Sequence, residues 1–121
     1  MSKEELNEAF RNRTKAYSVA VICFCKAIPY HYVDKLILTQ LVRSASSVAA
    51  NYRAACRARS KAEFHSKISI VVEEADEAVF WLEVIEEAKI DNSAVLKGLI
   101  IEGTQILKIV ASTRKGLEQQ N

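Results

Sequence analysis

Hydrophobic residues recur every three or four positions along most of the chain, and short polar breaks separate four such stretches. This period is that of one face of an α-helix, whereas a half-buried β-strand alternates every second residue. In the first stretch the apolar positions are Leu6, Phe10, Tyr17, Val21, Phe24 and Ile28. The pattern predicts helices over residues 3–28, 34–56, 61–88 and 93–118.

Local sequence signals indicate where these helices begin and end. Ser2 with Glu5, and Ser60 with Glu63, have the spacing of a capping box. In that motif the serine oxygen accepts from a free backbone N–H, and the glutamate reaches back to the serine N–H. Pro29 ends the first helix, because proline disfavours helical geometry in the residue before it.

The length and order of these elements predict a single all-α domain over residues 1–121. Long helices joined by short loops place sequential helices antiparallel, which gives an up-and-down four-helix bundle. Three glycines and one proline are too few to punctuate a strand-and-turn fold. The second helix is rich in serine and alanine, which favours close packing within the bundle.

The third helix is apolar on more than one side. Its inward stripe is Phe64, Ile68, Val71, Val72, Ala75, Val79, Leu82 and Ile85. At about 100° per residue, another set falls outside this stripe: Ile70, Phe80, Trp81 and Val84. A helix with a second apolar side needs a second surface to pack on. We interpret these four residues as a subunit interface; the alternative is that Trp81 covers one end of the core.

Charge is unevenly distributed, although the formal net charge is only +2. Residues 35–67 are mainly basic and residues 73–91 are mainly acidic. The candidate nucleic-acid-binding residues lie around the second turn and the start of the third helix: Arg53, Arg57, Arg59, Lys61 and Lys67. Such side chains contact phosphates, and a symmetric oligomer would multiply their effect. The alternative is that they pair with the acidic third helix.

The sequence predicts no enzymatic activity, no cofactor and no metal. No phosphate-binding glycine loop is present, and no cysteine or histidine cluster has zinc spacing. Glu73, Glu74 and Glu77 lack the Glu-x-x-His pairs of di-iron bundles, so a solvated face explains them better. Cys56 has arginine neighbours but no evident base.

The cysteines and the absence of a signal sequence predict a cytoplasmic protein. Cys23 and Cys25 point in different directions on one helix, and an odd number of cysteines cannot all pair, so we expect reduced thiols. The apolar run over residues 16–28 is interrupted by polar residues and is too short to span a bilayer.

An ordered set of polar and small residues in the second and third helices carries a family resemblance. The set consists of Gln40 to Ala45, Ser47, Asn51, Tyr52, Arg59 to Phe64, Lys67, Glu73 to Ala75, Glu77, and Trp81 to Glu83. With these residues the chain resembles the four-helix bundle proteins of the 23S ribosomal RNA intervening-sequence family, also known as S23 ribosomal proteins.

This resemblance implies a homopentameric barrel of bundles without enzymatic activity. It also implies a relationship to the accessory proteins of diversity-generating retroelements, which are basic pentamers that bind a reverse transcriptase and nucleic acid. Carried over, the motif positions are Arg43, Asn51, Ser60, Glu63, Glu74 and Glu77, in structural roles.

Two hypotheses follow. The first is a homopentamer that associates with RNA or DNA, with a reverse transcriptase or another protein as a further partner. The second is an oligomeric protein–protein adaptor that binds no nucleic acid.

Overall fold

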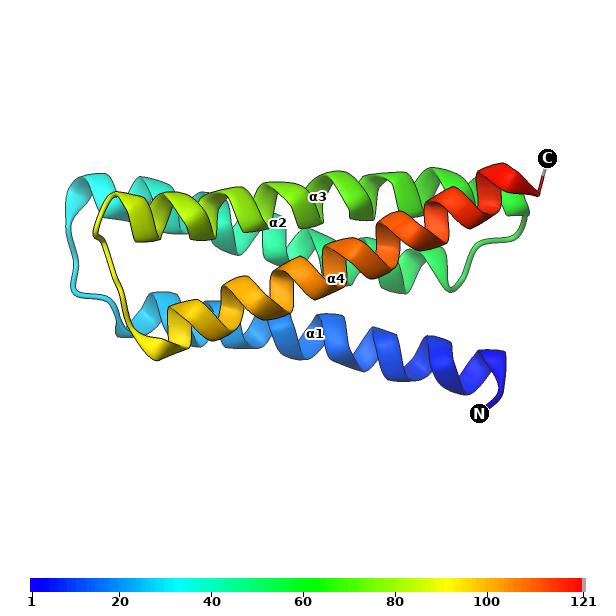
Figure 1. The fold of residues 1–121 in the computed structure, drawn as a ribbon, viewed down its shortest axis with the longest axis horizontal. Helices are drawn as coiled ribbons and strands as arrows, with labels where there is room; N and C mark the ends of the chain where they lie inside the picture. The colour runs from blue at the N-terminus through cyan, green and yellow to red at the C-terminus, as the bar shows by residue number, and fades with distance from the viewer. Residues whose placement is uncertain (121) are drawn as a thin grey trace.

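The computed structural model describes residues 1–120, so Asn121, the last residue of the predicted domain, lies outside the described part. Four helices follow one another: α1 (Lys3–Ala27), α2 (Tyr32–Ala55), α3 (Lys61–Glu87) and α4 (Ala94–Gln119). Successive helices run antiparallel and are joined by short loops (Figure 1). The described residues contain no strand. The predicted all-α four-helix arrangement is therefore confirmed.

The N-terminal caps of α1 and α3 form as the sequence indicates, one of them completely. The Glu5 N–H donates to Ser2 Oγ and the Ser2 N–H donates to Glu5 Oε1, each at 3.1 Å. Ser60 Oγ accepts from the Glu63 N–H at 3.1 Å. The Glu63 carboxylate instead lies 3.8 Å from the Arg59 guanidinium, one turn away. The serine half of the α3 box thus forms, while its glutamate pairs with a basic side chain.

The other helix boundaries differ from the predicted ones by one or two residues. α2 begins at Tyr32 rather than near Asp34, and its N-cap residue, His31, makes no side-chain cap hydrogen bond. Because Pro29 restricts the residue before it, it fixes the end of α1 and leaves the start of α2 unspecified. At the other turn Lys89 has a φ of 59°, a left-handed conformation that stops α3.

The core lies between all four helices and consists of one apolar face from each. Its fully buried larger side chains are Val21, Leu41, Val48, Ile68, Val71, Leu82, Ile85, Leu96, Ile106 and Val110. Val79, which the pattern places in the inward stripe of α3, is only half-buried, and its neighbour Ala78 is buried instead. Leu6, also predicted to be inside, is 55% exposed.

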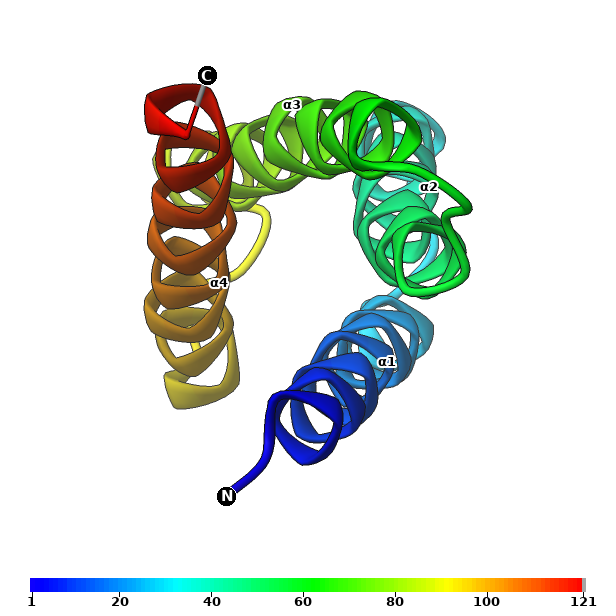
Figure 2. The same ribbon diagram turned by 90° about the vertical axis from the view of Figure 1, so that its right-hand side faces the viewer.

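The exposure of Leu6 follows from the divergence of α1 from α4. The two helices approach each other at one end of the bundle and separate toward the end that carries the N-terminus (Figures 1 and 2). α1 packs mainly on α2, and it meets α4 over a shorter length. Leu6 lies near the diverging end of α1, so no apolar face of α4 covers it.

Gly103 permits the close approach of α4 to α1. A Cβ at this position would lie 2.7 Å from Tyr17 Oη and 3.3 Å from a methyl of Val79. Tyr17 is buried, and its hydroxyl has no hydrogen-bond partner among the described residues. Burial raises the pKa of this hydroxyl, so the group stays neutral in the core.

A charged clamp joins α1 to α4 at this crossing. Arg13 donates through Nε to Glu102 Oε2 at 2.9 Å and through Nη2 to Glu102 Oε1 at 2.7 Å. The same Nη2 donates to Gln105 Oε1 at 2.7 Å. The hydrogen bond from Arg13 lowers the pKa of the Glu102 carboxyl. The fork geometry fixes the register of two helices that share little apolar surface.

Replacing Gly103 tests the close crossing. Gly103→Ala adds a methyl group against the Tyr17 hydroxyl, and overpacking of this kind costs about 1–3 kcal/mol, partly offset by about 1 kcal/mol of helix propensity. We expect a net loss of about 1 kcal/mol in urea unfolding. In a Tyr17→Phe background, which lacks the hydroxyl, the same substitution should cost less. Additive losses in the double variant would contradict the proposed contact.

The Arg13–Glu102 clamp predicts a pH-dependent contribution to stability. Because the folded pKa of Glu102 lies below its unfolded value of about 4.3, the contribution is present above that value and is lost as the pH falls through the folded pKa. Glu102→Gln should reduce the free energy of unfolding by up to about 1 kcal/mol at pH 7, and this difference should shrink as the pH falls below about 4. A difference that stays constant on acidification until the protein unfolds would argue against the ion pair. Glu86→Gln, an exposed position outside the ion pairs of the described chain, is the control.

Candidate nucleic-acid interface

A groove on the outer side of the α1–α2 packing seam is lined by four basic side chains. α1 contributes Arg11 and Lys15, α2 contributes Arg53, and the turn after α2 contributes Arg57. Between them lie Asn12, Ser46, Ala49 and Ala50, and the groove encloses about 580 Å³. We call this the basic groove.

Helix geometry accounts for the arrangement. Arg11 and Lys15 are four residues apart on α1, so they stack along one helix face, and Arg57 follows Arg53 by four residues, in the turn that ends α2. Antiparallel packing then brings the two pairs to opposite walls of the same groove. The small side chains on the α2 side leave the groove open to a bulky group such as a phosphate.

The basic groove keeps its charge unneutralised. None of the residues that line it is acidic. None of its four basic side chains takes part in an ion pair with any described residue. Like charges gathered in a concave surface reinforce one another and attract anions.

The basic groove holds two of the five residues predicted to bind nucleic acid, Arg53 and Arg57. Arg59 and Lys61 instead line a separate hollow at the end of the bundle, between the start of α1 and the end of α4. Lys67 is half-buried on α3 and lines neither hollow.

The sequence reasoning missed Arg11 and Lys15, because the basic stretch was sought within one segment. Their four-residue spacing was visible in the sequence. Their position opposite Arg53 and Arg57 becomes evident only when α1 and α2 are aligned antiparallel.

Arg43, elsewhere in the basic stretch, pairs with α3. Arg43 donates to Glu74 Oε2 at 2.9 Å and, through its other terminal nitrogen, to Glu77 Oε2. The Trp81 indole N–H donates to the same Glu77 oxygen at 3.1 Å. This hydrogen bond, followed by that from Arg43, lowers the pKa of Glu77. The motif positions Arg43, Glu74 and Glu77 therefore join α2 to α3.

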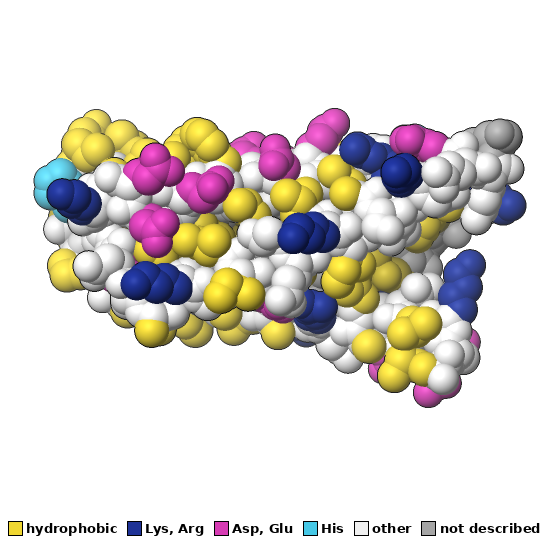
Figure 3. All heavy atoms as spheres, in the orientation of Figure 1, with side chains coloured by type: hydrophobic (Ala, Val, Ile, Leu, Met, Phe, Trp, Pro, Cys, Tyr) yellow, Lys and Arg dark blue, Asp and Glu magenta, His cyan; other side chains and the backbone are white. Residues whose placement is uncertain are grey.

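The four residues predicted to form a subunit interface share the outer face of α3. Phe80 is 52% exposed and Ile70 is 38% exposed, while Trp81 and Val84 are half-buried. Trp81 also packs against the core, which agrees in part with the alternative that this side chain covers the core. Along the upper edge of the molecule, where α3 lies, acidic side chains gather with hydrophobic ones exposed between them (Figure 3).

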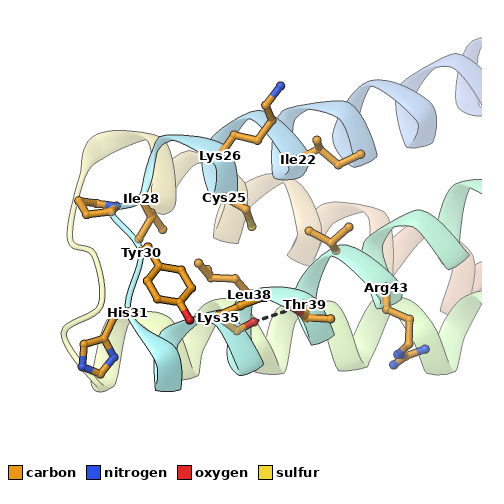
Figure 4. Close-up of a pocket in the computed structure, with 12 residues that line it drawn as sticks. Ile22, Cys25, Lys26, Ile28, Tyr30, His31, Lys35, Leu38, Thr39 and Arg43 are labelled. Atoms are coloured by element: carbon orange, nitrogen blue, oxygen red, sulfur yellow. Dashed lines mark hydrogen bonds between the residues drawn. The ribbon is translucent and has the colours of Figure 1, made fainter.

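The α1–α2 seam continues beyond the basic groove into an apolar one of about 580 Å³. Its hydrophobic lining residues include Ile22, Cys25, Ile28, Tyr30, Leu38 and Val42, and its basic ones are Lys26, Lys35, His31 and Arg43. We call this the apolar groove. Figure 4 shows Cys25 and Leu38 pointing between the two helices and the Tyr30 ring at the loop end. Burial raises the pKa of the Cys25 thiol to about 11, so the sulfur is protonated at neutral pH.

Nowhere in residues 1–120 do three or more histidine, cysteine, aspartate or glutamate side chains gather closely enough to hold a metal ion. None of the four helices combines the length and the apolar character that crossing a membrane requires.

Comparisons with known proteins agree with this architecture. Residues 7–112 match the family described as 23S rRNA-intervening sequence protein. A crystal structure of a protein of unknown function from the S23 ribosomal protein family of Bacteroides thetaiotaomicron VPI-5482 is similar, with 26% sequence identity and a TM-score of 0.79. The similarity covers 87% of this chain and 97% of that one. A comparison with curated proteins gives no match. The match over most of its length shows that the chain belongs to the 23S rRNA-intervening sequence protein family.

Proposed function

We propose that this protein is a non-enzymatic cytoplasmic homopentamer that binds RNA or DNA through the basic groove. The observation that carries the proposal is the set of four basic side chains, Arg11, Lys15, Arg53 and Arg57, in one groove with no acidic lining residue. Cations without internal partners are free to bind phosphates. The small side chains between them let a sugar–phosphate backbone approach closely.

The chemistry of the basic groove favours backbone contacts over base readout. Arginine and lysine bind phosphate through charge and hydrogen bonds, independently of sequence. The residues that line the groove include no aromatic side chain on which an unpaired base would stack. We therefore expect weak, salt-sensitive binding by one chain and tighter binding by an oligomer that presents several grooves at once.

Assembly in this proposal uses the outer face of α3. Ile70 and Phe80 are exposed apolar side chains on a helix whose other face already fills the core, and burying them would remove apolar surface from water. A further protein, such as a reverse transcriptase, would then bind the assembled oligomer rather than the single chain.

Neutralising the basic groove tests nucleic-acid binding. Four phosphate contacts give a slope of about −3.6 when log affinity for a DNA duplex is plotted against log salt. Lys15→Gln with Arg53→Gln should reduce the slope by about 2 and the affinity by tenfold or more at low salt, measured by fluorescence anisotropy with a labelled duplex. Lys97→Gln with Lys108→Gln removes the same charge from exposed positions on α4 and should change binding little.

Two results would count against the proposal. One is an absence of binding to RNA and DNA at low salt by an intact oligomer. The other is an equal loss of affinity in the α4 control variant, which would indicate a diffuse effect of net charge. The first result would favour the adaptor hypothesis, which capture of a protein partner from nuclease-treated lysate would then test.

A further inference from the structure

Phe80 projects from the outer face of α3 within a ring of carboxylates. Its neighbours one turn away on the helix surface include Asp76 and Glu83, and Glu73 and Glu87 lie two turns away. Asp76, Glu83 and Glu87 are exposed and form no ion pair with any described residue. The Phe80 ring meets Trp81 edge to face, with 4.9 Å between ring centroids. We call Phe80 with these acidic neighbours the acidic knob.

The apolar groove has the complementary character. Hydrophobic side chains from both helices form its walls, and Ile22, at one side, is 38% exposed. Lys26 and Lys35 stand at its rim, and neither forms an ion pair within the described chain. Figure 4 shows the Lys26 side chain extending away from the groove into open space, where it can meet an approaching charge. An aromatic side chain surrounded by carboxylates fits both features.

The knob and the groove of one chain cannot meet each other, because they lie on different helices and face outward. We propose that the apolar groove of one chain receives Phe80 of a second copy, with Lys26 and Lys35 facing the carboxylates of the knob. This inference rests on the proposed assembly through α3 and names the surface that α3 contacts. Burial of the Phe80 ring would supply most of the free energy of association, and the charge pairs would set the orientation of the two chains.

Contact between two different surfaces of identical chains is head-to-tail, and such contacts produce either closed rings or open filaments. A ring needs two things: no displacement along its axis at each contact, and a rotation between neighbours that closes. Arg43, which lines the apolar groove, is hydrogen-bonded to Glu77, one helical turn before Phe80. Knob and groove therefore lie at a similar height along the bundle. Chains packed side by side through this contact need no displacement along the bundle axis, which meets the first requirement for the proposed pentamer.

A mixing experiment tests this pairing. Phe80→Glu disables the knob and leaves the groove intact, whereas Ile22→Glu disables the groove and leaves the knob intact. Each variant alone should have the mass of one chain in light scattering, and an equimolar mixture should form a dimer that grows no further. Only a head-to-tail contact gives this result, because two chains joined knob to knob would not be rescued by mixing.

Folding and specificity need matched controls. Both substituted positions are partly exposed, so the helical circular dichroism spectrum and the melting temperature of each variant should stay close to those of the wild type. Ile101→Glu places the same charge on α4, at a side chain that is 60% exposed and belongs to neither surface. This variant should keep the wild-type mass.

The possible failures are distinguishable. A monomeric wild type would overturn both the pairing and the proposed oligomer. An oligomeric wild type that is unaffected by Phe80→Glu, or variants that do not associate on mixing, would overturn the pairing alone. Disassembly of the Ile101→Glu control would also overturn it, since assembly would then depend on α4. If the apolar groove instead binds another protein or a small molecule, Ile22→Glu should abolish that binding and leave the mass of the wild-type oligomer unchanged. This outcome would also overturn the pairing.

Discussion

Close packing of α1 on the small-residue face of α2 is the contact on which both candidate surfaces depend. Ser46, Ala49 and Ala50 of α2 lie at the seam with α1, and Ser18 of α1 donates a hydrogen bond to Ser46 at 3.2 Å. Larger side chains here would separate the helices and widen the seam between them. Because both the basic and the apolar groove lie along the outer side of this seam, their walls and spacing are set by the same packing.

The division of charge along the chain has two physical outcomes rather than one. Where basic α2 faces acidic α3, Arg43 is neutralised by Glu74 and Glu77 and stabilises the bundle. Where α2 faces α1, no acidic side chain lines the groove beside Arg53, so its charge is left for an external anion. Asp76, Glu83 and Glu87 on the outer face of α3 likewise form no ion pair with any described residue. A net charge of +2 therefore conceals two strongly charged surfaces of opposite sign.

The helices and their ends could be predicted from the sequence, because caps and helix breakers act within a few adjacent residues. Contacts that depend on how two helices are aligned could not be predicted. The Ser2 cap and the helix-ending Pro29 act within one turn of chain, and the structure places both as expected. Ala78 is buried where the pattern predicts Val79. The two positions lie at opposite edges of the apolar stripe, and the tilt of the adjacent helix determines which of them is covered. Lys15 joined the basic groove through tertiary packing alone, which no pattern within one segment reveals.

The two proposed interactions, phosphate binding and assembly through Phe80, depend differently on salt concentration. This difference determines how they would work together. Phosphate binding by the basic groove depends on charge and weakens steeply with salt, whereas burial of Phe80 in the apolar groove depends on removing apolar surface from water. An assembly built on the second would persist under conditions that weaken the first. Four cations in one groove bind a nucleic acid weakly, and their repetition around a ring would make the binding effective. In the proposed assembly, substitution of Phe80 would therefore weaken nucleic-acid binding as substitution of Arg53 would, because Phe80 would fix how many basic grooves act together.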